Sequence, residues 1–326
     1  MLKTWMTVLL ALILTAALAA CGNTGGSNED AGSSTSPQQT APAAEPGATV
    51  YPLTVKDATG QEFTFEKAPE KVISVSPAET EALFAIGLDT EIVGVSDYDD
   101  YPEVAKSKPK MGGITKPNEE AIIAAQPDVV FTGISMDEEA VNKLRELGIT
   151  IFKTDPKSVE DVMNNITLYG TIMDRQQEAK AITDKMKADV AEVQEGVKNI
   201  GDSQRLRVYV EFSPGWTVGK GEFMDEMITL AGGENIASDT KGWNQISEEK
   251  VIAANPDVIL YSKSVVDENG QTLEQMIKGR DGWNHINAIR NNRIFGLDDN
   301  LISRPGPRVT EGLKEVAKGI YPEVFK

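Results

Sequence analysis

Short apolar runs alternate with amphipathic segments through most of the chain. Runs of four to six β-branched and aromatic residues predict strands, and segments with apolar residues at every third or fourth position predict helices. In the first half, strands are expected at residues 71–76, 92–95, 128–132 and 149–152, and helices at 78–87 and 138–147. In the second half, strands are expected at 207–212, 257–261 and 293–297, and helices at 223–231, 273–278 and 310–320. This alternation predicts an α/β fold of βαβ units around mostly parallel sheets.

A period-two pattern, typical of strands, precedes these βαβ units in the chain. Leu53, Val55, Phe63 and Phe65 alternate with polar residues on either side of the turn-forming residues 58–60. Period-two alternation around a glycine-containing turn predicts a β-hairpin at the start of the folded region.

One segment of the first half is repeated in the second. Residues 118–130 and 247–259 lie 129 positions apart and are identical at eight of thirteen positions. Each copy reads as a short helix followed by Pro-Asp and a strand. We therefore expect two Rossmann-like lobes built on one plan, at residues 50–160 and 204–326.

The segment between the lobes, residues 161–203, is predicted to be helical. From 175 to 198 its apolar positions recur every three or four residues, which predicts one amphipathic helix about 36 Å long. These positions are Ala179, Ile182, Met186, Val190, Val193 and Val197. A coiled coil is the competing interpretation, but the segment is barely three heptads long. A single helix would hold the lobes at a nearly fixed separation, with a cleft between them.

The first fifty residues have the composition of an export signal and a tether. Thirteen residues from 8 to 20 are apolar except Thr15, too few to cross a bilayer but typical of a signal peptide, predicted at 1–20. Residues 18–21, Leu-Ala-Ala-Cys, resemble a bacterial lipobox, and Cys21 is the only cysteine in the chain. Residues 21–49 are then a lipidated cysteine and a disordered linker with a reach of roughly 30 Å.

Charge and residue inventory exclude several function classes. The net charge is −18, which disfavours nucleic acid or an anionic membrane as the main partner. His285 is the only histidine, so histidine-cluster metal sites and histidine-based catalytic triads are excluded. Residues 215–221 resemble a phosphate-binding loop but are one residue too short. We expect no catalytic residue, no metal site and no enzyme.

The candidate ligand-binding residues are aromatic side chains in predicted loops. Tyr98 follows the strand at 92–95, Trp216 follows the strand at 207–212, and Trp243 precedes the repeated helix of the second half. Loops beyond the carboxyl ends of parallel strands line the ligand crevice, where aromatic rings can pack on a broad, flat ligand. Arg304 and Arg308 could reach carboxylate or amide oxygens of that ligand. For Arg308, helix capping or a salt bridge between lobes is an equally good interpretation.

Paired glutamates open both copies of the repeat. Glu119 and Glu120 follow Asn118, and Glu248 and Glu249 follow Ser247, so each pair lies in the first turn of its helix. Acidic residues there complement the helix dipole. The dipole alone does not explain the same pair on both lobes.

Residues 53–326 resemble the substrate-binding proteins of iron–siderophore and cobalamin importers, the type with one helical backbone between two lobes. The segments that carry the resemblance are residues 72–81, 94–102, 231–235 and 304–308 and both Ala-Ala-x-Pro-Asp segments. Residues 76–81 and 97–102 look most like the cobalamin-binding branch. The resemblance implies that Tyr98, Trp216 and Trp243 clasp the corrinoid and that Arg304 contacts it. A tryptophan of that branch is missing near Ile114.

The resemblance also implies a partner. Glu120 and Glu249 match the glutamates that dock, one from each lobe, into arginine pockets of the membrane permease. We therefore expect a monomeric, extracytoplasmic lipoprotein that captures cobalamin or a related corrinoid and delivers it to an ABC permease dimer with its ATPase. A ferric siderophore or haem is the alternative ligand, and a surface lipoprotein without a transport role is the alternative function.

Overall fold

The first lobe is built on a four-stranded parallel sheet. The structure is a computed structural model that describes residues 47–325, so the predicted signal peptide and Cys21 lie outside it.

The sheet of the first lobe has the order β4-β3-β5-β6. Its strands are β3 (Val72–Ser74), β4 (Ile92–Val95), β5 (Val129–Thr132) and β6 (Ile151–Lys153). Its helices are α1 (Pro77–Ala85), η1 (Glu103–Ser107), α2 (Glu119–Ala125) and α3 (Glu138–Glu146). Residues of β3 and β5 are buried throughout, as their unbroken apolar runs predict.

The predicted hairpin forms β1 (Leu53–Lys56) and β2 (Glu62–Phe65), which pair antiparallel. Asp57 fixes it to the sheet. The buried Asp57 carboxylate accepts hydrogen bonds from Arg145 at 2.5 Å and from the backbone N–H of Lys153 at 3.1 Å. A buried carboxylate with this many donors is satisfied, so the hairpin turn is anchored to β6 and α3.

The second lobe has its own four-stranded parallel sheet, in the order β12-β11-β7-β9. Its strands are β7 (Arg207–Glu211), β9 (Glu234–Asn235), β11 (Val258–Ser262) and β12 (Ile294–Leu297). Its helices are η2 (Asp202–Gln204), α6 (Phe223–Leu230), α7 (Glu248–Ala254), α8 (Leu273–Gly279), η3 (Trp283–His285), α9 (Asn287–Arg290), α10 (Asp299–Ser303) and α11 (Val309–Ile320). A separate ribbon of β8 (Trp216–Val218) and β10 (Trp243–Gln245) was not predicted.

The two sheets share one topology. Read as β4-β3-β5-β6 and β9-β7-β11-β12, both place their strands in the chain order 2-1-3-4. The repeated segment occupies the same place in each, as α2 before β5 and α7 before β11. Asp128 accepts from the backbone N–H of Lys71 at 2.9 Å, and Asp257 accepts from that of Arg207 at 3.0 Å. The repeated aspartate therefore ties each helix turn to the first strand of its sheet, and the prediction of two lobes on one plan is confirmed.

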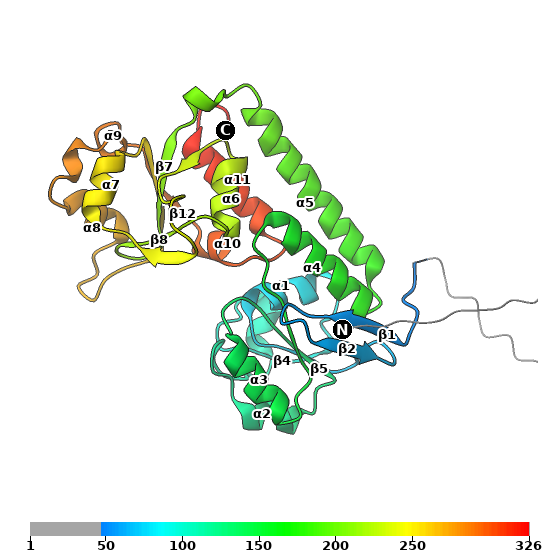
Figure 1. The fold of residues 1–326 in the computed structure, drawn as a ribbon. Coiled ribbons are helices and arrows are strands. Elements are labelled where there is room, and N and C mark those ends of the chain that lie inside the picture. Colours follow the sequence, from blue (N-terminus) through cyan, green and yellow to red (C-terminus); the bar gives the residue numbers. More distant parts are fainter. Residues whose placement is uncertain (1–46, 326) are drawn as a thin grey trace, which may run out of the picture. The chain divides into compact units, whose positions relative to one another are not determined.

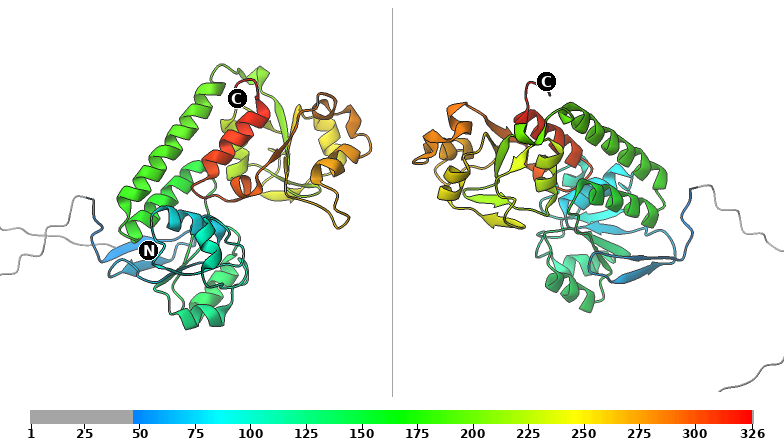
Figure 2. Two further views of the ribbon diagram at one scale, coloured as in Figure 1. Left: turned by 180° about the vertical axis from the view of Figure 1, so that it is seen from behind. Right: turned by 45° about the horizontal axis from the view of Figure 1, so that its top comes forward.

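Two helices connect the lobes along the chain (Figure 1). The predicted long helix is α5 (Gln176–Val197), one residue shorter at each end than expected. It is preceded by α4 (Val159–Ile172), which we did not predict as a separate helix; the break has Asp174 at a positive φ of 54°. Figures 1 and 2 show α5 lying against α4 and α11. None of the helices between residues 47 and 325 combines the length and apolarity that a membrane span requires.

Asp189 joins α5 to α11. Its largely buried carboxylate accepts from Lys314 at 2.5 Å and from Thr310 at 3.0 Å, both on α11. Partial burial disfavours the carboxylate, but the hydrogen bonds from Lys314, Lys185 and Thr310 outweigh it and lower the pKa of Asp189. The connecting helix α5 is therefore held against the second lobe by an ion pair and a hydrogen bond as well as by apolar packing.

Candidate functional site

Residues from both lobes line a cavity of about 330 Å³. The first lobe contributes Ile134, Ser135 and Lys157, and the second contributes Glu222, Trp243 and Ser303. Most of these residues follow the carboxyl ends of strands or start helices, where open α/β sheets bind ligands. Among the described residues, no group of three or more His, Cys, Asp or Glu side chains is arranged to hold a metal ion.

The ribbon of β8 and β10 presents two tryptophans on one face. Trp216 pairs with Gln245, and Trp243 pairs with Val218. Because side chains alternate along a strand and directly paired residues share a face, Trp216 and Trp243 lie diagonally on the same face of the ribbon. Trp216 is 42% exposed and Trp243 37% exposed. The Trp243 ring packs edge-on against Phe212, with ring centroids 4.4 Å apart, which fixes its orientation.

Tyr98 lies on the first lobe in a loop held by a buried acid. Its side chain is 61% exposed. The neighbouring Asp99 is buried and accepts a hydrogen bond from the backbone N–H of Ser96 at 2.5 Å. Burial raises the pKa of Asp99, and hydrogen bonds from Ser96 and the charge of Lys110 counter only part of this effect. The loop is thus fixed from within while the tyrosine ring remains exposed.

Arg304 and Arg308 reach across to the first lobe. Both donate to Glu81 of α1: Arg304 at 3.1 Å, and Arg308 through Nε at 2.8 Å and Nη2 at 2.6 Å. Arg304 also donates to Asp100 at 2.7 Å. Partial burial of Asp100 opposes ionisation, but the hydrogen bond and charge of Arg304 outweigh it and lower the pKa of Asp100. Arg308 also lies over the ring of Tyr101, 3.9 Å from its centroid.

A second ionic contact crosses the cavity. Lys157 donates to both oxygens of Glu222, at 3.3 and 3.4 Å. Beside it, the backbone N–H of Val159 donates to Glu226 of α6 at 2.6 Å. We refer to the contacts of Glu81 with Arg304 and Arg308, together with that of Lys157 with Glu222, as the interlobe ion pairs.

The predicted ligand residues are only partly brought together. Trp216 and Trp243 share the ribbon, and Trp243 lines the cavity. Arg304 contacts Asp100, two residues from Tyr98. Within residues 47–325, no aromatic contact joins Tyr98 to either tryptophan.

Three interlobe residues were missed in the sequence. These are Glu81, Lys157 and Glu222. Glu81 ends the segment 76–81 that carries the family resemblance, but no contact between the lobes was expected of it. For Arg308, the salt-bridge interpretation is confirmed.

The repeated glutamates differ within each pair. Glu119 pairs with Lys143 at 2.6 Å, and Glu248 lies 3.5 Å from Arg280, which is itself held by buried Glu211. Glu120 and Glu249 are exposed, and neither forms an ion pair within residues 47–325. In both lobes, therefore, the first acid forms an ion pair within its lobe, whereas the second is exposed and forms none among the described residues.

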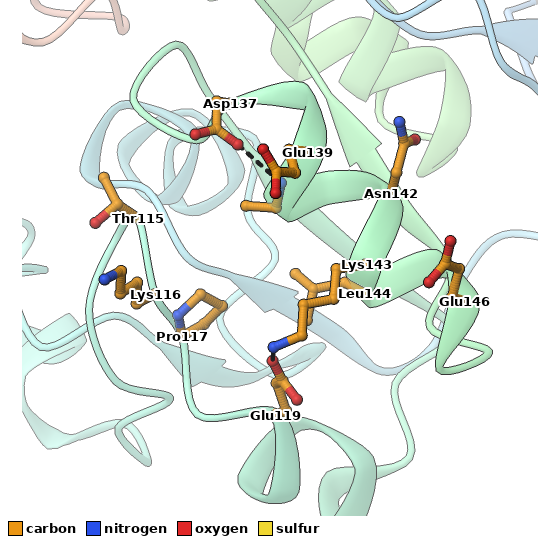
Figure 3. Close-up of a pocket in the computed structure, with 11 residues that line it drawn as sticks. Thr115, Lys116, Pro117, Glu119, Asp137, Glu139, Asn142, Lys143, Leu144 and Glu146 are labelled. Carbon is orange, nitrogen blue, oxygen red and sulfur yellow. Dashed lines mark hydrogen bonds and ion pairs between the residues drawn. The ribbon is translucent and has the colours of Figure 1, made fainter.

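A larger cavity, of about 1120 Å³, lies within the first lobe between the start of α2 and α3 (Figure 3). Its lining is mostly charged and polar, and it includes the Glu119–Lys143 ion pair. It contains no aromatic residue and no residue of the second lobe. We therefore place the candidate ligand site at the smaller cavity between the lobes.

Comparisons with a family model and with known proteins point to the same family of binding proteins. Residues 72–301 match the family described as periplasmic binding protein. YvrC of Bacillus subtilis, an uncharacterized ABC transporter substrate-binding lipoprotein, is 33% identical over 329 residues, which cover 99% of this chain and 98% of YvrC. A cobalamin-binding protein of Halobacterium salinarum is 28% identical over 277 residues, covering 83% of this chain and 74% of that protein.

One solved structure is similar to this chain in both fold and sequence. It is a possible iron-binding, periplasmic solute-binding protein from Staphylococcus epidermidis, with a TM-score of 0.67 and 31% identity. The match covers 78% of this chain and all of the other.

Proposed function

Because this chain belongs to the periplasmic binding protein family of ABC-importer substrate-binding proteins, we propose that it captures cobalamin or a related corrinoid and delivers it to an ABC permease. Proteins of this class bind and hand over a small molecule, so the activity is binding and delivery rather than catalysis.

The observation that carries the corrinoid proposal is the ribbon with two exposed tryptophans on one face. Trp216 and Trp243 offer a broad aromatic surface, and Tyr98 offers a third exposed ring on the other lobe. Aromatic faces of this kind suit a wide, flat ligand better than a small ion. The cobalamin-binding relative from Halobacterium salinarum supports the same ligand class. A ferric siderophore is the second candidate, favoured by the 31% identity to a possible iron-binding protein.

Ligand entry requires the lobes to move apart, which departs from the nearly fixed separation expected from the sequence. A cavity of about 330 Å³ is at the lower end of the range for small-molecule sites and is too small for a corrinoid. The interlobe ion pairs join the two lobes, and Lys157 and Glu222 also line the cavity, so separating the lobes must break or rearrange these pairs. Arg304 would then exchange a carboxylate partner for an amide or carboxylate oxygen of the ligand.

Membrane attachment and docking complete the proposal. Lipid on Cys21 would hold the protein on the extracytoplasmic face of the cell membrane, as the lipoprotein relative suggests. Exposed Glu120 and Glu249, one on each lobe and free of ion pairs within the described residues, would meet cationic side chains of the permease.

Uptake by whole cells tests this function. In a strain lacking the protein, we expect wild-type protein to restore uptake of labelled cyanocobalamin and the Glu120→Gln/Glu249→Gln variant to fail. The matched control is Glu119→Gln/Glu248→Gln, which removes acids from the same helices but should retain uptake. Full uptake with the Glu120/Glu249 variant would refute the docking assignment. No rescue by wild type would refute cobalamin transport and favour the siderophore or a surface role without transport.

A further inference from the structure

The internal repeat separates positions used for folding from positions that are not. Of its eight identities, Glu119 and Glu248 form ion pairs within their lobes. Asp128 and Asp257 tie the repeat to the first strand of each sheet. The identical valines after them begin the buried strands β5 and β11. These identities follow from building the same lobe twice.

Three of the other five identical positions are exposed in both copies and make none of these contacts. They form what we call the docking rows, which are Glu120, Ile123 and Ala124 on α2 and Glu249, Ile252 and Ala253 on α7. All six residues are exposed. The spacing i, i+3, i+4 places each row on one face of its helix. Figures 1 and 2 show α2 and α7 away from α5, at the parts of the lobes that the connecting helix does not cover.

The isoleucines are the unexpected members. Ile123 is 49% exposed and Ile252 is 36% exposed, whereas Ile122 and Val251 beside them are buried and supply the core contact of each helix. One exposed isoleucine on a protein surface is ordinary. The same exposed isoleucine, one turn after an unpaired glutamate on both lobes, is explained by a partner that meets both lobes in the same way.

We propose that the docking rows bind a two-fold symmetric permease dimer, with each glutamate meeting a cation and each isoleucine filling an adjacent apolar depression. This inference rests on the proposed docking of Glu120 and Glu249 and adds the apolar half of that contact. Two nearly identical rows on one chain match a partner that presents the same site twice. A second copy of this chain would set glutamate against glutamate, and an anionic lipid surface would repel both rows.

The two parts of a row have separable effects. Exposed charges at an interface rim mainly change the association rate and its salt dependence. Apolar side chains that become buried on binding mainly slow dissociation. The glutamates should therefore steer the encounter, and the isoleucines should set how long the complex lasts.

The test compares three double variants in binding to the host's permease–ATPase complex in lipid nanodiscs. Ile123→Ala/Ile252→Ala removes the apolar part while keeping good helix formers at both positions. Leu147→Ala/Val266→Ala is the matched control, because it shortens one exposed apolar side chain on each lobe outside the rows. Glu120→Gln/Glu249→Gln removes the charge. Association and dissociation rates, salt dependence and stimulated ATPase activity are measured for each.

We expect the isoleucine variant to bind roughly tenfold more weakly, a change of about 1.4 kcal/mol, through faster dissociation and with its salt dependence retained. The control should bind as wild type does. All variants should keep wild-type ligand affinity and melting temperature.

Each other outcome has a distinct meaning. If the isoleucine variant binds like the control while the glutamate variant is impaired, the apolar contact is refuted and the proposed docking stands. If both variants bind like wild type, the docking proposal fails as well. The permease would be refuted as the occupant of the docking rows if wild type bound equally well to permease-free nanodiscs. It would also be refuted if wild type self-associated and the Ile123→Ala/Ile252→Ala variant did not.

Discussion

Replacing Glu81 with glutamine should open the cleft of the ligand-free protein. Glu81 is 3% exposed and accepts three hydrogen bonds from Arg304 and Arg308 of the other lobe, at 2.6, 2.8 and 3.1 Å. Glutamine keeps the shape of the side chain but removes the charge and one acceptor. Gly306 lies between the two arginines, where a Cβ would be 3.0 Å from the Ala78 carbonyl oxygen, so the loop is seated closely on α1.

The free-energy cost of Glu81→Gln to the closed arrangement follows from the burial and geometry of these ion pairs. Removing one partner of a buried ion pair costs about 3–5 kcal/mol, which is an upper limit here because Asp100 still neutralises Arg304. The guanidinium side chains are only 14% and 18% exposed, so solvent screens the lost charge weakly. We expect Glu81→Gln to destabilise the closed arrangement relative to the open one by about 2–4 kcal/mol. At 1.4 kcal/mol per factor of ten, this lowers the closed-to-open ratio roughly 30-fold to 700-fold.

Distances between spin labels measure this directly. Labels on Glu139→Cys and Asn284→Cys, exposed positions on the two lobes, are introduced in a chain whose Cys21 is replaced by serine. Glu81→Gln should lengthen and broaden the interlobe distance without ligand. Glu62→Gln is the control, because its carboxylate pairs with Lys56 on the exposed surface and contributes little. An unchanged distance in Glu81→Gln, with a normal melting temperature, would show that the ion pairs of Glu81 do not hold the lobes together.

Three further predictions concern ligand contact, membrane attachment and stability. Trp216→Ala and Trp243→Ala should each weaken binding by about 2 kcal/mol, roughly thirtyfold in a fluorescence titration, and wild-type affinity in both would place the ligand elsewhere. Cys21→Ala should release the protein from the membrane fraction; unchanged fractionation with normal processing would disprove the lipid anchor. Asp189→Asn should lose about 1–3 kcal/mol of unfolding free energy in urea at pH 7, and a change within error would show that the α5–α11 bond is not stabilising. Because the pKa of Asp189 is lowered on folding, this difference should be full above about pH 4 and disappear as the pH falls through the lowered value.

The architecture was accessible from the sequence because its signals are local. The apolar runs that became β3, β5, β7 and β11 are buried on both faces, so they read as continuous strands. The repeat predicted two lobes on one plan, and the two sheets have the same strand order. The period of α5 gave its ends to within one residue.

The ribbon and α4 were missed for physical reasons. β8 and β10 have three residues each, too few for alternation to be detected, and 24 residues separate them in the chain. Both tryptophans were therefore expected in loops, whereas the ribbon fixes them on one face. α4 merged with the long helix because both are amphipathic, and only the turn around Asp174 separates them.

The candidate site was predicted by residue type but not by connectivity. The arginines at 304 and 308 stand out in the sequence, yet nothing local indicates that they pair with Glu81, more than 220 positions away. Likewise, the repeat singles out both glutamates of each pair. Only the contacts of Lys143 and Arg280 show that Glu119 and Glu248 form ion pairs within the protein, whereas Glu120 and Glu249 form none within residues 47–325.

The most direct test of the account is a titration of the purified, unlipidated Cys21→Ser protein with cyanocobalamin, followed by quenching of tryptophan fluorescence. Haem and a panel of ferric siderophores are titrated in parallel. We predict saturable one-to-one binding of cyanocobalamin, weaker binding of the other ligands, and loss of most of the quenching in the Trp216→Ala/Trp243→Ala variant. Tighter binding of a siderophore or haem, or no saturable binding of cyanocobalamin, would contradict the corrinoid assignment.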